Sequence, residues 1–287
     1  MIAWASDPEA LGPPPPGVEI VGEANPQVEF VVPRWTESHA LGELPALRVV
    51  QVLSAGVDWI ADRVPKGVTL CSARGARDGA MAEWIVWALL ADAKRARPLC
   101  EQQARGEWHV VPLGDLARRV LILGHGSIGR ETEARLAPFG VEVIGVARRA
   151  RPGVHTMADL PRLLPEVDAV VNLLPATPAT DGLVDAKVLG AMRPGALYVN
   201  AGRGATTDTD ALVAALQDGH IRAVVDVTEP EPLPEGHPLW SAPGVIITPH
   251  HAGDTPAAER ASWRLAADQL RRYAAGEPLR NVVSDGY

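Results

Sequence analysis

Three glycines near the middle of the chain have the spacing of a phosphate-binding turn. Gly124, Gly126 and Gly129 form Gly-x-Gly-x-x-Gly directly after the apolar residues 120–123, and a helical pattern follows. Such an apolar run predicts a buried parallel strand. In a turn of this kind Gly124 permits the bend, Gly126 lets a pyrophosphate approach the backbone, and Gly129 lets the helix pack on the strand. Because a helix N-terminus attracts anions, the sequence predicts a dinucleotide site here.

The segment after the next predicted strand bears on which dinucleotide would bind. Residues 141–146 predict this strand, and Ala147-Arg148-Arg149-Ala150-Arg151 follows it. An NAD-specific site places Asp or Glu about 20 residues after the glycines, and this segment contains no carboxylate. The guanidinium groups of Arg148 and Arg149 match a 2′-phosphate in charge and in forked geometry. We therefore expect NADP(H) to be preferred over NAD(H), unless the segment is only a solvated basic turn.

Polar side chains suited to acid–base chemistry follow three further predicted strands. Arg203 comes just after the apolar residues 196–200, Glu231 after residues 223–227, and His250 after residues 245–248. Ligands of parallel α/β sheets bind at the carboxyl ends of the strands. A guanidinium, a carboxylate and an imidazole at such strand ends predict a reaction site.

The elements that must position these residues alternate between strand and helix. In the second part of the chain this alternation predicts a parallel, doubly wound sheet of the Rossmann type. Residues 1–5, 28–32, 49–53 and 68–71 predict the strands of a smaller, flavodoxin-like α/β domain. A helix rich in Ala, Leu and Trp begins near Asp78. The amphipathic helix of residues 257–275 is expected to return to the first domain.

Composition and charge exclude several classes of protein. The net charge of −8 argues against non-specific nucleic-acid binding. The chain shows neither a signal peptide nor an apolar run that could span a membrane. Its two cysteines form no disulfide framework and no metal-ligand spacing, so we expect a cytoplasmic protein without a metal.

Taken together, the motifs make the sequence similar to the D-isomer-specific 2-hydroxyacid dehydrogenase family. Members of that family include glyoxylate/hydroxypyruvate reductases and phosphoglycerate dehydrogenases. The motifs that carry the resemblance span most of the chain: Ser54–Asp58, Ala82-Glu83, Gly124–Gly129, Leu174–Thr177, Arg193–Gly195, Asn200–Gly204 with Asp208, Asp226–Pro232, and Pro249-His250. The resemblance implies a discontinuous substrate-binding domain (residues 1–92 and 259–287) and a dinucleotide-binding domain (residues 93–258).

The resemblance also implies roles for the polar residues at the strand ends. Arg203 would bind the 2-oxo group and the carboxylate of the substrate and polarise the carbonyl. His250 would protonate the developing alkoxide. Glu231 would hydrogen-bond the other imidazole nitrogen and fix the orientation of the ring. Glu229 competes for the carboxylate role and His251 for the imidazole role, but the family motif favours Glu231 and His250.

Binding residues are implied in the same way. The backbone amides of Ala55, Gly56 and Val57, together with Arg203 and His250, would hold the substrate. Asp226 would bond the nicotinamide carboxamide. The expected cofactor-binding set is Gly124, Gly126, Ser127, Ile128, Gly129, Arg148, Arg149, Leu174, Pro175, Arg203, Asp226 and His250. His125, inside the glycine motif, is expected to be an exposed loop residue.

The function implied by the resemblance is hydride transfer between NADP(H) and a small 2-oxo or 2-hydroxy acid. Glyoxylate and hydroxypyruvate are the leading substrates, and the D isomer is the expected product. A homodimer is expected, with the Ala/Leu/Trp helix region at its interface. A dinucleotide-sensing protein of the corepressor type, without significant turnover, is the alternative. A formate or phosphite dehydrogenase is a third reading.

Overall fold

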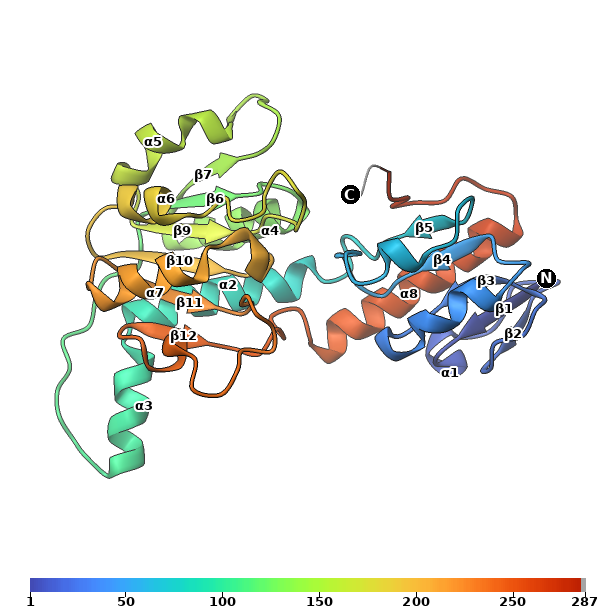
Figure 1. Cartoon of the computed structure of the whole chain (residues 1–287), viewed down its shortest axis with the longest axis horizontal. Helices are drawn as coiled ribbons and strands as arrows, with labels where there is room; N and C mark the ends of the chain where they lie inside the picture. Colours follow the sequence, from blue (N-terminus) through green and yellow to red (C-terminus); the bar gives the residue numbers. More distant parts are fainter. Residues whose placement is uncertain (285–287) are drawn as a thin grey trace. The chain divides into compact units, whose positions relative to one another are not determined.

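The chain folds into two compact units, one of which is discontinuous in sequence. The computed structural model describes residues 1–284, apart from the side chains of residues 35, 38 and 40. The first unit joins Met1–Ala80 to the segment that begins at Gly253, and the second is Met81–Ala252 (Figure 1). The sequence placed the boundaries later, after residue 92 and before residue 259. Residues 285–287 of that expected domain lie outside the described residues.

The first boundary lies early because the helix that crosses it packs into the second unit. This helix is α2 (Asp78–Ala93). Its side chains Trp84, Ile85 and Leu89 belong to a core formed with strands of the second unit. Only the first residues of α2 are therefore part of the first unit.

The second unit is built on a parallel sheet. Within residues 1–284 its strands are β6 (Arg119–Leu123), β7 (Glu142–Val146), β8 (Val154–His155), β9 (Ala169–Asn172), β10 (Ala196–Asn200), β11 (Ile221–Val225) and β12 (Val245–Ile247). Their order is β12-β11-β10-β9-β6-β7-β8, and every pair is parallel. The chain reverses its direction of winding between β6 and β9, which is the position where Rossmann sheets bind dinucleotides. The predicted doubly wound sheet is confirmed.

Helices cover both faces of this sheet. They are α4 (Ser127–Leu136), α5 (Leu160–Leu163), α6 (Ala186–Ala191) and α7 (Thr209–Gln217), besides α2. The helix α3 (Ala96–Arg105) has no buried residue and belongs to neither core. One core holds side chains of α5, α6 and α7, and the other holds those of α2 and α4. The central strands β9 and β10 are buried along their whole length, so all their residues before the final asparagine are apolar rather than alternately so.

The first unit has the strand order of a flavodoxin-like fold. Its strands are β1 (Ile2–Ala5), β2 (Glu19–Val21), β3 (Val28–Val32), β4 (Val49–Gln51) and β5 (Thr69–Cys71), in the parallel order β2-β1-β3-β4-β5. Its helices are α1 (Pro8–Leu11) and α8 (Pro256–Ala274). As predicted, the last helix returns to this unit, where Trp263, Ala266 and Leu270 pack with Phe30 and Val32.

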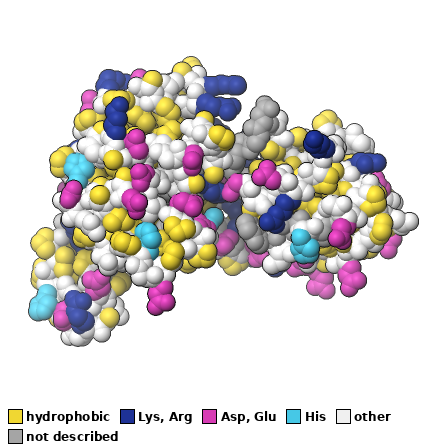
Figure 2. Space-filling model, in the orientation of Figure 1, with side chains coloured by type: hydrophobic (Ala, Val, Ile, Leu, Met, Phe, Trp, Pro, Cys, Tyr) yellow, Lys and Arg dark blue, Asp and Glu magenta, His cyan; other side chains and the backbone are white. Residues whose placement is uncertain are grey.

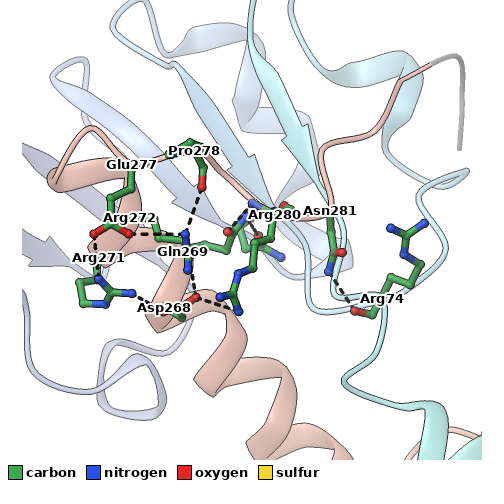
Figure 3. A network of polar contacts seen from close by, with 10 residues as sticks. Arg74, Asp268, Gln269, Arg271, Arg272, Glu277, Pro278, Arg280 and Asn281 are labelled. Carbon is green, nitrogen blue, oxygen red and sulfur yellow. Dashed lines mark hydrogen bonds and ion pairs between the residues drawn. The ribbon is translucent and has the colours of Figure 1, made fainter. Parts of the chain in front are cut away.

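The chain after α8 closes the edge of this sheet. The Ser72 amide donates to the Asn281 carbonyl at 3.0 Å, and the Val283 amide donates to the Leu70 carbonyl at 2.9 Å. Figure 3 shows the Asn281 side chain donating to the Arg74 carbonyl at 2.9 Å. These bonds cover the edge of β5, which would otherwise expose unpaired backbone groups.

The end of α8 holds this tail in place through polar side chains. Gln269 is fully buried; its amide donates to the Arg280 carbonyl at 2.8 Å and accepts the Arg280 amide at 2.9 Å (Figure 3). Beside it, hydrogen bonds from Arg271 and Arg272 hold the pKa of the Asp268 carboxyl below its usual range. The tail is therefore part of the first unit's fold.

Two features of the described residues bear on location. None of their helices is both long enough and apolar enough to cross a membrane. Cys71 and Cys100 are free, and burial raises the pKa of the Cys71 thiol to about 11. A cytoplasmic location stays a prediction.

Candidate functional site

The predicted glycine turn joins β6 to α4. Gly124 has a φ of +91°, and a Cβ there would lie 2.8 Å from the Leu173 carbonyl oxygen. A Cβ on Gly129 would lie 3.3 Å from the Ile122 side chain. At Gly126, the nearest described atom would be 3.9 Å away. Gly124 and Gly129 thus allow close packing, whereas Gly126 leaves space beside the backbone.

The first amides of α4 are left for a ligand or water. Gly126 is the N-cap and has no side chain that could cap them. The helical ladder begins with the Arg130 amide, which donates to the Gly126 carbonyl at 3.1 Å. The amides of Ser127, Ile128 and Gly129 therefore precede the ladder at the positive end of the helix dipole, as an anion site requires.

His125 is not an exposed loop residue, so that prediction was wrong. It is only 7% exposed, because its ring lies against the backbone of Gly145 in β7. The ring is also tied by polar contacts to Glu133 of α4 and to Arg151 after β7. The sequence offered no local signal for this burial, which depends on a glycine in the neighbouring strand.

Arg148 and Arg149 are exposed in the loop that follows β7. Neither guanidinium forms a hydrogen bond or ion pair with the described residues. Figure 2 shows Lys and Arg side chains projecting at the edge of the second unit where this loop lies in Figure 1. Arg151, by contrast, is engaged with His125. Two of the arginines in the predicted basic segment are thus open to an anion.

The ends of β9 and β10 are shaped by a pair of asparagines. Asn172 accepts the Leu174 amide at 3.0 Å, and Asn200 accepts the Gly202 amide at 3.1 Å. Both side chains are buried. Each bond turns the chain sharply where its strand ends. Leu174 is buried and Pro175 is half-buried in the first of these turns, both within the predicted cofactor-binding set.

Buried hydroxyl groups complete the hydrogen bonds of these asparagines. The Asn172 amide donates to the Tyr198 hydroxyl and to Thr206 at 2.8 Å each, and Tyr198 bonds Thr207 at 2.6 Å. Burial raises the pKa of Tyr198 to about 12. The Asn200 amide donates to Thr207 at 3.1 Å. This network fixes the loop after β10 and was not predicted from the sequence.

Arg203 lies between two glycines that let neighbouring loops approach closely. A Cβ on Gly202 would lie 2.6 Å from the Leu174 carbonyl oxygen, in the turn after β9. A Cβ on Gly204 would collide with the Thr228 carbonyl group, after β11. The backbone of this loop therefore packs closely against the segments that follow β9 and β11. The Arg203 guanidinium donates to the Gly202 carbonyl at 2.8 Å.

Asp226 organises the turn after β12. Its carboxylate accepts the Thr248 hydroxyl at 2.5 Å, the His251 amide at 3.0 Å and the Ala252 amide at 2.9 Å. Its carbonyl accepts the His250 amide at 2.7 Å. Asp226 is 3% exposed. The structure shows that Asp226 shapes the backbone around His250, whereas its role as a nicotinamide ligand stays a prediction.

Glu231 and His250 form the predicted carboxylate–imidazole pair. His250 Nδ1 lies 2.5 Å from Glu231 Oε1, and the side chains are 45% and 38% exposed, respectively. Glu229 instead uses its carbonyl, which accepts the Thr209 hydroxyl at 2.6 Å. His251 contributes its backbone amide to Asp226. Of the competing residues, only Glu231 and His250 contact each other through their side chains in the described part of the chain.

The expected substrate loop belongs to the first unit and follows β4. Gly56 and Val57 are buried and Ala55 is half-buried. The Ser54 hydroxyl donates to the Gly56 carbonyl at 2.6 Å and accepts the Trp59 indole N–H at 3.1 Å. Among the described residues, the amides of Ala55, Gly56 and Val57 have no acceptor. The loop is thus held by Ser54 and offers amide donors, as a carboxylate ligand requires.

Comparison with known proteins shows the family. Residues 86–252 match the model for the NAD-binding domain of D-isomer-specific 2-hydroxyacid dehydrogenases. Human glyoxylate reductase/hydroxypyruvate reductase is 32% identical over 248 residues, which cover 81% of this chain and 76% of that protein.

Solved structures extend the match to the whole fold. A D-isomer-specific 2-hydroxyacid dehydrogenase of Xanthobacter autotrophicus, in complex with NADPH, aligns with a TM-score of 0.83 and 32% identity, covering 100% of this chain and 99% of that one. An NADPH-dependent glyoxylate/hydroxypyruvate reductase of Sinorhizobium meliloti, in complex with NADP, aligns with a TM-score of 0.85 and 28% identity, with the same coverage. The chain therefore belongs to the D-isomer-specific 2-hydroxyacid dehydrogenase family.

Proposed function

We propose that the protein reduces small 2-oxo acids with NADPH to D-2-hydroxy acids and catalyses the reverse oxidation. The observation that carries this proposal is the contact between Glu231 and His250 at the end of a dinucleotide-type sheet. A paired imidazole is the common proton donor and acceptor of enzymes. The relatives named as glyoxylate or hydroxypyruvate reductases support glyoxylate and hydroxypyruvate as substrates.

Different residues of this chain bind the substrate, polarise its carbonyl and transfer the proton during carbonyl reduction. Arg203 binds the carboxylate and polarises the 2-oxo group, which lowers the energy of the developing oxyanion. The amides of Ala55, Gly56 and Val57 hold the carboxylate. When bound, the nicotinamide supplies the hydride to the carbonyl carbon. His250 gives a proton to the carbonyl oxygen, so a hydride and a proton complete the hydroxy acid.

Glu231 determines which imidazole nitrogen can do this. Its carboxylate accepts a hydrogen bond from His250 Nδ1, so Nε2 is the nitrogen left to donate a proton to the substrate. Glu231 is thus a positioning residue for His250. The same arrangement serves the reverse reaction, in which Nε2 accepts the hydroxyl proton.

Replacement of His250 tests the acid–base assignment. We expect His250→Asn to lower kcat by roughly 10²- to 10⁴-fold, because the proton donor is lost. The variant should still bind NADPH, because most of the expected cofactor contacts lie elsewhere, and His251→Asn is the matched control. The measurement is NADPH oxidation against glyoxylate, hydroxypyruvate, pyruvate, phenylpyruvate and 2-oxoglutarate, with calorimetry for cofactor binding.

Two results would go against the proposal. Near-normal turnover by His250→Asn would remove the histidine from the acid–base role. Tight NADPH binding by the wild type without turnover of any of these acids would favour a dinucleotide-sensing protein instead.

We also propose that Arg148 and Arg149 make the protein prefer NADP(H). Their charge is open to a ligand in the described structure, and the solved relatives in complex with NADPH or NADP support the preference. We expect Arg148→Gln with Arg149→Gln to weaken NADPH binding by about 10- to 100-fold, since charge-assisted bonds to phosphate are lost. NADH binding should be unaffected. Arg260→Gln, at an exposed arginine of the other unit, is the control. If the double variant lost affinity for NADPH and NADH equally, the assignment of Arg148 and Arg149 would be contradicted.

An exposed apolar surface of the second unit supports a homodimer. Trp108 and Val110, in the loop after α3, are 96% and 94% exposed, and Leu113, Trp87 and Leu99 are exposed as well. A monomer rarely leaves large apolar side chains such as those of Trp108 and Val110 almost fully in water. We propose that a second copy covers it, as the Ala/Leu/Trp helix region predicts. Light scattering should give a molar mass of twice the chain mass for the wild type, and Trp108→Ser should lower this measured mass. A monomeric wild type would contradict the proposal.

A further inference from the structure

We infer that His125 is a positioning residue for the cofactor's 2′-phosphate, although it lies within the glycine turn. It holds Arg151, and through Arg151 it fixes the loop that presents Arg148 and Arg149. This inference rests on the proposed preference for NADP(H). It adds a residue that the glycine motif does not single out, because the motif defines no residue type between the first two glycines.

The imidazole of His125 fits into a space that a glycine of the neighbouring strand leaves open. Gly145 of β7 lies beneath the ring, and a Cβ at Gly145 would come within 2.7 Å of His125 Cγ. A Cβ at Gly129 would lie 3.4 Å from His125 Cδ2, which is ordinary van der Waals contact. The absence of a side chain at Gly145 therefore leaves room for the buried histidine.

The neighbours of the His125 ring determine which ring nitrogen donates and which accepts a hydrogen bond. The Arg151 guanidinium can only donate, so His125 Nδ1 accepts from it, at 3.2 Å. The ring proton is then on Nε2, which donates to Glu133 Oε2 at 2.8 Å. The same guanidinium also donates to the His125 carbonyl. Arg151, His125 and Glu133 thus form a chain from the loop after β7 to α4.

This chain ties the arginine loop to the phosphate-binding turn. The amides of Gly124 and His125 both donate to the Val146 carbonyl, at 2.9 and 3.0 Å, which joins the turn to the end of β7. At the far end of the loop, Arg151 is held by His125 and by the Val154 amide, which donates to its carbonyl at 2.9 Å.

Arg148 and Arg149 lie between these two anchors. Among the described residues their guanidinium groups have no partner, whereas Arg151 does. The loop is therefore fixed at both ends while its central charges remain open. A loop fixed in this way loses less conformational entropy when it binds a phosphate.

Two substitutions at His125 separate this role from simple packing. Asn can place a carbonyl oxygen near the position of Nδ1 and accept from Arg151, whereas Ala cannot. We expect His125→Ala to weaken NADPH binding by about tenfold, the value of one positioned charge-assisted hydrogen bond, and to leave NADH binding unchanged. His125→Asn should bind NADPH more tightly than His125→Ala. Gly145→Ala, which displaces the ring without removing a polar group, should repeat the selective loss.

A double-substitution cycle adds a result that a merely structural role would not give. When Arg148→Gln and Arg149→Gln are already present, His125→Ala should have little further effect on NADPH binding, because its effect acts through those arginines. Calorimetry with NADPH and NADH measures all these variants. The inference, but not the proposed cofactor preference, would be overturned by any of three results. These are an equal weakening of NADPH and NADH binding by His125→Ala, no change in the binding of either cofactor, and full additivity in the cycle. A wild type that binds NADH as tightly as NADPH would overturn the proposed preference and the inference with it.

Discussion

The carboxylate of Asp226 is the group on which the rest of the candidate site depends. It is buried at the end of β11, where an unpaired charge would be costly, and the turn after β12 supplies the donors that satisfy it. His250 has a φ of +51°, a region that residues other than glycine seldom adopt. The bonds from the His251 and Ala252 amides compensate for that conformation. The direction of the imidazole toward Glu231 therefore follows from the hydrogen bonds of a residue in the neighbouring strand.

The same physical rule shapes the other strand ends. Asn172 and Asn200 are buried polar residues that each turn their own chain, and hydroxyl groups below them complete their hydrogen bonds. Because the strands are parallel, these turns lie along one edge of the sheet. Gly202 and Gly204 then allow the loops to pack so closely that Arg203 has little freedom of backbone position. The candidate site is rigid because the buried polar groups that support it form hydrogen bonds with backbone groups as well as with side chains.

The sequence predicted the large features of the fold well and the individual contacts poorly. Apolar runs such as residues 120–123 and 196–200 indicated strands covered on both faces, which is a local property. β2 and β8 were not predicted, since they are short strands at the edges of their sheets and have no buried residue that would produce an apolar run. The burial of His125 was missed because it depends on Gly145 in another strand. The Glu231–His250 contact followed from family motifs, whereas the structural role of Asp226 required three-dimensional neighbours.

Hydrogen exchange at the amides of His251 and Ala252 is the most direct measurement of whether Asp226 orders the turn that carries His250. Asn at position 226 keeps the size of the side chain but offers one acceptor oxygen and turns an N–H₂ group toward the turn. We expect Asp226→Asn to speed exchange at these two amides by about 10- to 100-fold, because a buried hydrogen bond to a charged group is lost. Amides in the centre of β6 should exchange as in the wild type. Unchanged exchange at His251 and Ala252 would contradict the account, because the turn would then hold its shape without the carboxylate.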